Sequence, residues 1–287
     1  MTTNKENLKK NNTETVRKRK TLEELTIQDD YLFKRIMEEN DICTGFLEIL
    51  LGIKIKEIVY IKIEEVMKEL YDSKGIRLDV YLKDNDDIVY NIEMQVTSID
   101  EEEFAKRFRY YEAMIDSYLL RLGQDYNKLN KLFIIFICPF KIFDGKKQLY
   151  TFKNFCEENK SIELKDDVTK IFISTKGEDK GNKNDDFEAL LKYIDGIKTE
   201  NPFINHIDNR INQIKQDEKE RGAYMQYDLH LRQIEKKAKE EGEKIGMTKA
   251  LFEIAKNMIL GNMPLDKIAE FTKLPISEIK KISAQMA

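Results

Sequence analysis

Hydrophobic residues recur along the chain with two different periods, and each period predicts one kind of element. Intervals of three and four residues predict helices, whereas alternating or short continuous apolar runs predict strands. The predicted helices are 29–40, 43–53 and 101–122, and the predicted strands are 57–66 (one strand or a strand pair), 75–84, 88–96, 131–140 and 168–174, with a further hairpin at 141–152. Elements in this order indicate an α/β domain with a mixed central sheet flanked by helices.

The pattern changes in the second half of the chain, where only helices are predicted. Helices are expected near 187–214, after a polar loop. Residues 215–244 carry many charges of both signs and few large aliphatic residues, which is typical of an exposed helix with ion pairs along its surface. Residues 246–287 regain a helical pattern, with three short helices separated at Gly261 and around Leu274–Pro275.

These changes predict four segments. They are a basic disordered tail at 1–20, the α/β domain at 21–200, a charged helical linker at 201–245 and a small α-helical C-terminal module at 246–287. The tail has almost no large apolar residues and therefore cannot build a core. Its basic residues either only solvate the chain or contact a phosphate backbone.

Composition limits the class of protein. Charged residues make up 36% of the 287 residues, but the formal net charge is only −4, so any contact with nucleic acid needs local basic patches. Three cysteines without paired spacing indicate a reducing compartment and a cytoplasmic location. The longest apolar run, 132–138, is too short to span a membrane. With only two histidines, a histidine-based zinc site is not expected.

The candidate chemistry lies in the hairpin 75–96. Asp79 stands between Leu78 and Val80, and Glu93 stands in the next apolar strand with Gln95 two residues later. Because side chains alternate along a strand, Glu93 and Gln95 point to the same side. Carboxylates among apolar neighbours are costly unless they are compensated, and a divalent cation compensates two carboxylates and an amide that converge.

The order Asp79, Glu93-Met94-Gln95 and then a helix resembles the core of the PD-(D/E)XK nucleases. More narrowly, the segments DDYLFKRIM, FLEILLGI, NIEMQV and RFRYYEAMIDSYLL resemble the Rpn family of recombination-promoting nucleases, also described as transposases. The resemblance covers roughly residues 26–175, and the C-terminal helices are also similar to the ends of that family. It implies a restriction-endonuclease-like fold and a Mg²⁺-dependent DNA endonuclease associated with recombination or transposition. DNA is then the partner, no membrane is involved, and a homodimer is one assembly that this function allows.

The resemblance also implies roles for individual residues. Asp79 and Glu93 would bind Mg²⁺, or another divalent cation, together with the backbone carbonyl of Met94, and Gln95 would orient a water or a phosphate oxygen. Arg107 would contact the scissile phosphate, with Tyr111 one turn further on the same helix face. An additional carboxylate would come from the first helices, where Asp30 is the first choice and Glu48 the second.

Two positions depart from the superfamily pattern. Gln95 stands where a lysine is usual and cannot supply a positive charge, and Leu78 replaces the proline before Asp79. An alternative is therefore a degenerate nuclease core that binds DNA or a partner without cleavage. A third hypothesis is an assembly module in which 215–287 oligomerises.

Each candidate residue also has a structural interpretation that the pattern leaves open. Asp79 can be an exposed strand residue, and Glu93 with Gln95 the polar face of an amphipathic strand. Arg107 can form a surface ion pair, Tyr111 can be core, and Asp30 can be a helix N-cap.

The C-terminal helices resemble a helix-turn-helix in spacing. Lys273 replaces the turn glycine, the second helix is expected to begin at Ser277, and it shows only Lys280 and Lys281 as basic groups. These helices therefore either read DNA or serve as a packing or oligomerisation module, and the weak basic character favours the second.

Overall fold

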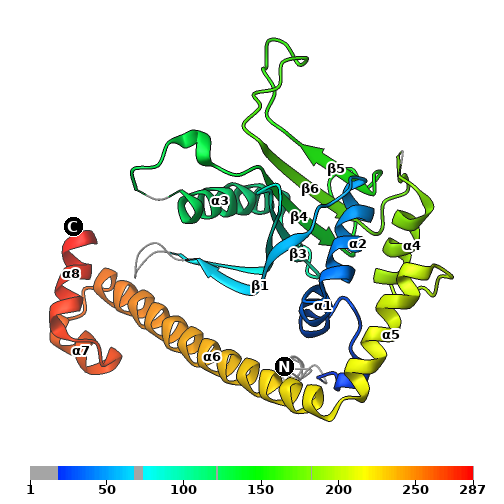
Figure 1. The fold of residues 1–287 in the computed structure, drawn as a ribbon. Coiled ribbons are helices and arrows are strands. Elements are labelled where there is room, and N and C mark those ends of the chain that lie inside the picture. Colours follow the sequence, from blue (N-terminus) through cyan, green and yellow to red (C-terminus); the bar gives the residue numbers. More distant parts are fainter. Residues whose placement is uncertain (1–18, 68–73, 121, 182, 287) are drawn as a thin grey trace, which may run out of the picture. The chain divides into compact units, whose positions relative to one another are not determined.

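The computed structural model describes residues 19–67, 74–120, 122–181 and 183–286. The chain forms two compact units, of which the first ends at Arg221 and the second begins at Gly222 (Figure 1). The predicted basic tail at 1–20 lies, except for its last two residues, outside the described part of the chain. None of the described helices is long and apolar enough to cross a membrane.

A mixed six-stranded sheet forms the centre of the first unit, in the order β1-β2-β3-β4-β6-β5. The strands are β1 (Ile58–Met67), β2 (Ile76–Asp84), β3 (Val89–Met94), β4 (Leu132–Cys138), β5 (Leu149–Phe152) and β6 (Val168–Ser174). β1, β2 and β3 pair antiparallel, whereas β3, β4 and β6 run parallel. The predicted α/β class and the hairpin of β2 and β3 are confirmed.

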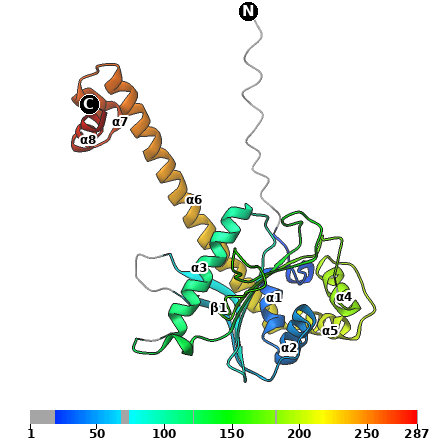
Figure 2. The same ribbon diagram turned by 90° about the horizontal axis from the view of Figure 1, so that it is seen from above.

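Helices cover both faces of this sheet, as Figure 2 shows from above. On one side lies α3 (Glu101–Leu119), and on the other lie α1 (Asp30–Met37), α2 (Asn40–Leu51), α4 (Asp185–Ile194) and α5 (Pro202–Gln216), while η1 (Leu22–Glu24) and η2 (Tyr126–Lys128) are single 3₁₀ turns. The rings of Phe104 and Phe108 pack against Phe136 of β4 and Phe172 of β6, with centroids 4.2 to 5.1 Å apart. Aromatic pairs of this kind fix the position of α3 over the sheet.

The predicted hairpin at 141–152 is wrong in one respect. Of these residues only β5 is a strand, and it pairs antiparallel with β6 rather than with a neighbour inside the segment. Residues 141–148 form turns, where Phe143 and Gly145 take positive φ angles of 50° and 68°. A strand partner that comes later in the chain leaves no local signal in the segment itself.

The first unit extends beyond residue 200, where the charged linker was expected to begin. Four isoleucines of α5, at positions 204, 207, 211 and 214, are buried. Their spacing places them on one helix face, which packs against α1, α2 and α4. Burial of this face makes α5 part of the first unit.

The second unit contains α6 (Glu218–Leu260) from Gly222 onward, together with α7 (Leu265–Thr272) and α8 (Ile276–Met286). The first of the three predicted short helices is therefore the end of a long helix. The small core of the second unit consists of Ala255, Ile268, Ile279 and Ile282. Lys273 ends α7 with φ 57°, so a lysine adopts the left-handed conformation for which a glycine is usual.

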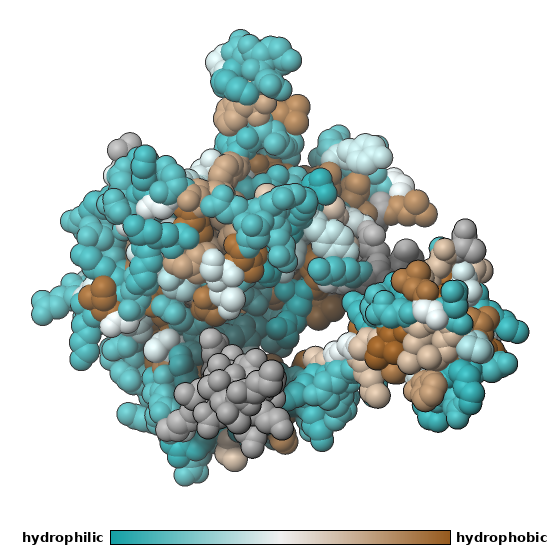
Figure 3. All heavy atoms as spheres, turned by 180° about the vertical axis from the view of Figure 1, so that it is seen from behind, coloured by the Kyte–Doolittle hydropathy of each residue, from teal (hydrophilic) through white to brown (hydrophobic). Residues whose placement is uncertain are grey.

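On the face drawn in Figure 3, hydrophobic side chains stand among hydrophilic ones. The face drawn in Figure 3 is mostly hydrophilic, as the high content of charged residues predicts. Single exposed apolar residues such as Leu122, Leu260 and Phe271 are normal for a folded protein.

A half-buried acid on α3 makes stability depend on pH. Burial, together with the nearby carboxylates of Glu112 and Asp166, raises the pKa of Asp116 to about 6, above the value of about 3.9 in an unfolded chain. The folded protein thus binds this proton more tightly, and the resulting stabilisation is complete below the unfolded pKa and lost as the pH rises through 6. We expect Asp116→Asn to raise the melting temperature at pH 7.5 and to leave it unchanged near pH 4. Thermal unfolding at both pH values checks this, and an equal shift at both would contradict it.

Candidate active site where two strands separate

The candidate site lies where the ladder between β2 and β3 ends. The last backbone pair of this ladder joins Val80 to Ile92. One residue further, the backbone N–H of Asp79 donates to Oε1 of Glu93 (3.1 Å), and the N–H of Met94 donates to Oδ2 of Asp79 (3.2 Å). The two carboxylates take the place of backbone acceptors, which holds them close to each other between the strands.

Both carboxylates are poorly hydrated. Glu93 is 2% exposed, and burial together with the charge of Asp79 raises its pKa well above the usual range. Burial also raises the pKa of Asp79, although the ammonium of Lys34 counteracts it. Two buried acids that disfavour each other's charge are typical of a site where a cation is bound or a proton is exchanged.

Lys34 is the cation that sequence reasoning missed. It is 4% exposed on α1, and its Nζ lies 2.6 Å from Asp30, 2.9 Å from Glu64 and 3.5 Å from Asp79. Burial alone would lower the pKa of Lys34, but these ion pairs raise it above the usual value. No pattern in α1 distinguishes Lys34 from a solvent-facing lysine, because its partners come from β1 and β2 as well as from its own helix.

The structure brings Asp30 to this cluster and leaves Glu48 apart from it. Asp30 is the first residue of α1, and the N-cap is its neighbour Asp29, so the capping interpretation of Asp30 is wrong. Glu48 instead accepts the N–H of Ile55 (3.0 Å) and pairs with Lys54 (2.8 Å). These contacts tie Glu48 to the loop that follows α2.

Arg107 of α3 reaches the site from the other side. Its Nη1 donates to Oε1 of Gln95 (2.8 Å), and its Nη2 lies 3.5 Å from Oε2 of Glu93. Nε and Nη2 both donate to the hydroxyl of Tyr111 (3.1 and 2.7 Å). Glu93 and Gln95 thus point to the same group, as alternation along a strand predicts, and Gln95 connects a guanidinium to the acids.

Tyr111 is part of both the hydrophobic core and the candidate site. Its ring is 6% exposed and packs against Phe136, while its hydroxyl holds Arg107. Burial and the charge of Glu93 raise its pKa to about 12. Tyr111 is therefore a protonated acceptor for Arg107 at neutral pH, and the core interpretation is right for its ring alone.

The donor set fits a hard divalent cation. The described residues contain no group of three or more His, Cys, Asp or Glu side chains that could hold a metal ion. The protein ligands available at this site are therefore the two carboxylates of Asp79 and Glu93. Mg²⁺ commonly binds through one or two carboxylates and keeps several waters. The amide of Asn91, two residues before Glu93, is buried and interacts with the Glu93 carboxyl, but within the described chain its atoms make no hydrogen bond of ordinary length and angle. The part of the Met94 carbonyl as a ligand stays a prediction.

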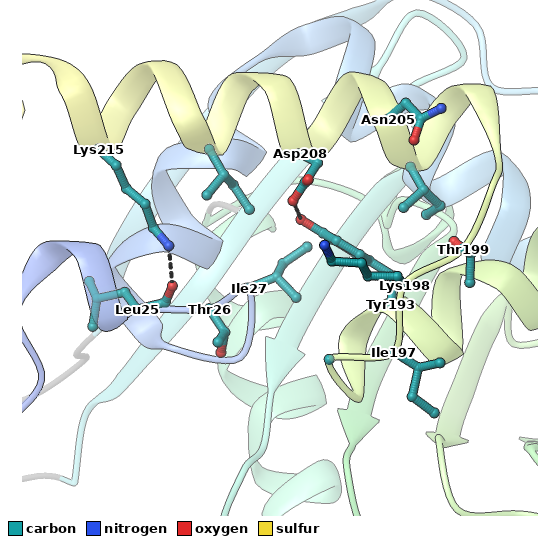
Figure 4. A pocket seen from close by; sticks show the side chains of 13 residues that line it. Leu25, Thr26, Ile27, Tyr193, Ile197, Lys198, Thr199, Asn205, Asp208 and Lys215 are labelled. Carbon is teal, nitrogen blue, oxygen red and sulfur yellow. Dashed lines mark hydrogen bonds between the residues drawn. The ribbon is translucent and has the colours of Figure 1, made fainter.

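A separate cavity of about 320 Å³ lies between residues 25–27, the α4–α5 loop and α5 (Figure 4). The hydroxyl of Tyr193 donates to Asp208 (3.0 Å), and Nζ of Lys215 donates to the carbonyl of Leu25 (2.7 Å). None of the candidate site residues lines this cavity. Its polar groups are largely paired, so it is not the candidate active site.

Comparison with known proteins agrees with this architecture. Residues 27–244 match a family model described as PD-(D/E)XK nuclease family transposase, and the match includes every strand of the sheet. No curated protein and no solved structure matches the chain. The expected family resemblance and the expected fold class are confirmed by the family match.

Proposed function

We propose, on the premise that this chain belongs to the PD-(D/E)XK nuclease family transposases, that it is a Mg²⁺-dependent DNA endonuclease that hydrolyses phosphodiester bonds. The observation that carries the proposal is the pair Asp79 and Glu93, held together where β2 and β3 separate. Lys34 and Arg107 compensate the charge of these two buried carboxylates only in part, at 3.5 Å each, and a bound divalent cation would stabilise both in the charged form. DNA recombination or transposition in the cytoplasm is the proposed setting.

Hydrolysis requires a water that attacks the phosphorus atom while the bond from phosphorus to O3′ breaks. A bound divalent cation would activate this water and offset charge on the phosphate. Asp79 and Glu93 would hold the cation with the Met94 carbonyl, and Gln95 would orient the water. The water oxygen remains on phosphorus as part of a 5′-phosphate, and O3′ takes a proton to become a hydroxyl.

Positive charge at the site would come from Lys34 and Arg107 rather than from position 95. Lys34 neutralises part of the charge on Asp79. The side chain of Arg107 is 31% exposed, so its guanidinium reaches solvent while it contacts Glu93 and Gln95. A guanidinium in this position suits contact with a phosphate oxygen of the DNA backbone.

Arg107→Met tests this contact. We expect plasmid cleavage to slow by about 100-fold, because a lost charge-assisted contact to the reacting phosphate costs roughly 2–3 kcal/mol. Arg109→Met is the matched control on the same helix, since Arg109 is exposed and makes no contact with Glu93 or Gln95. Equal loss in both variants would point to general attraction of DNA by the helix instead.

Supercoiled plasmid incubated with the purified full chain, in Mg²⁺ and in EDTA, tests the proposed function. Nicking or linearisation in Mg²⁺ alone supports the endonuclease. Plasmid binding without cleavage in Mg²⁺ or Mn²⁺ supports the alternative, a degenerate core that holds DNA or a partner. The uncharged Gln95 is the observation that favours this second candidate. Light scattering of the same sample decides whether a homodimer forms.

A further inference from the structure

Asn91 is a buried amide whose polar atoms have no hydrogen-bond partner. It lies in the middle of β3 with 0% exposure, and neither Nδ2 nor Oδ1 is hydrogen-bonded within the described part of the chain. An unpaired buried polar group costs about 1–3 kcal/mol. A strand position between Tyr90 and Ile92 would be filled more stably by an apolar residue, so the amide lowers the stability of the protein in this state.

The surroundings of Asn91 connect it to the candidate site. It pairs with Tyr81 of β2 and with Ile134 of β4. Glu93 is two residues further along β3, so the two side chains project to the same side of the strand. Burial and Asp79 raise the pKa of Glu93, and a side-chain interaction with Asn91 partly offsets this rise, in agreement with the strand geometry.

We propose that Asn91 is a positioning residue for the Glu93 carboxylate, to which its Nδ2 donates a hydrogen bond when that carboxylate holds a divalent cation. This inference rests on the proposed function and deepens it. Glu93 accepts the N–H of Asp79 through Oε1, and Arg107 lies 3.5 Å from Oε2. A third donor beneath the carboxylate fixes its rotation, and such supporting groups orient the ligands of metal sites.

The unpaired amide is explained by this role. In this structure Asn91 acts on Glu93 closely enough to lower its pKa, but within the described chain neither amide atom makes a hydrogen bond of ordinary length and angle. A cation that fixes the rotation of the Glu93 carboxylate would complete this hydrogen bond, so the cost of the unpaired amide would fall when the site is occupied. A purely structural asparagine would be satisfied in the metal-free protein as well.

Asn91→Leu distinguishes a positioning role from a purely structural role, because it removes both polar atoms and keeps the position filled. We expect the metal-free variant to unfold at the same or a higher urea concentration than the wild type. We expect its Kd for Mg²⁺, measured by calorimetry on the full chain, to be about 10- to 100-fold weaker. The rise in melting temperature on addition of Mg²⁺ should shrink accordingly. Asn91→Ala, which cannot overfill the site, should show the same weaker Kd.

Thr199→Val is the matched control. The hydroxyl of Thr199 is also buried and has no hydrogen-bond partner among the described residues, but it lines the cavity of Figure 4 instead of the candidate site. Its removal should leave the Mg²⁺ affinity unchanged. Equal Mg²⁺ affinity in wild type and Asn91→Leu would overturn the role of Asn91 and leave the proposed function intact. Strong destabilisation of the metal-free variant would do the same. If wild type binds no divalent cation, the metal site of the proposed function fails with it.

Discussion

Asp79→Asn is expected to slow cleavage of supercoiled plasmid by about 1,000-fold or more, because a site that loses a metal ligand loses about 4 kcal/mol of transition-state stabilisation. The fold should persist. An asparagine oxygen can still accept the N–H of Met94, and Lys34 keeps its ion pairs with Asp30 and Glu64. The substitution also removes one of two carboxylates that disfavour each other's charge. The metal-free melting temperature should therefore stay the same or rise.

Asp86→Asn is the control for this prediction. Asp86 lies in the turn of the same hairpin and forms an exposed ion pair with Lys56, so its neutralisation should leave cleavage intact. Initial rates of nicking and thermal unfolding, measured for both variants, check the expectation. Persistent cleavage by Asp79→Asn would place the chemistry elsewhere, and an unfolded Asp79→Asn protein would give the residue a structural role.

Lys34→Met is expected to destabilise the metal-free protein by about 3 kcal/mol at neutral pH, the lower end of the range for removing one partner of a buried ion pair. The loss is large because the ammonium is the shared partner of Asp30, Glu64 and Asp79. The loss of stability stays at the lower end of that range because the side chains of Asp30 and Glu64 are 39% and 40% exposed, so water can hydrate them once Lys34 is removed. Urea unfolding without metal measures this difference.

Lys83→Met is the corresponding surface control. Lys83 pairs with Asp87 in an exposed i, i+4 arrangement, and such pairs contribute about 0.5 kcal/mol or less. A loss of stability in Lys34→Met no larger than in Lys83→Met would show that Lys34 does not hold the acids together.

Local pattern was sufficient to predict the elements around the site. The hairpin 75–96 was visible from its apolar runs and turn residues, and Asp79 and Glu93 stood out as acids among apolar neighbours. The helix after them was predicted from its aromatic stripe, which packs on Phe136 and Phe172. In each of these cases the signal lies within a few residues, because strand alternation and helical spacing are local properties.

The burial of α5 and the position of Asn91 leave only weak signals in the sequence. The four isoleucines of α5 recur at helical spacing, yet the segment from 201 was assigned to a linker. Asn91 stands in the same apolar strand as Glu93, but an amide is less conspicuous there than an acid. In both cases burial depends on one helix face or on one residue, which average charge and composition along a segment do not reveal.

The sequence alone determined the family resemblance, the α/β class and the two carboxylates, since each depends on order and spacing along the chain. Only the tertiary structure decided that Lys34 lies against Asp79, that Arg107 contacts both Glu93 and Gln95, and that the amide of Asn91 is unpaired. These contacts join α1, β2, β3 and α3. They depend on how the helices pack over the sheet and where the β2–β3 ladder ends, and no local period along the chain carries that information.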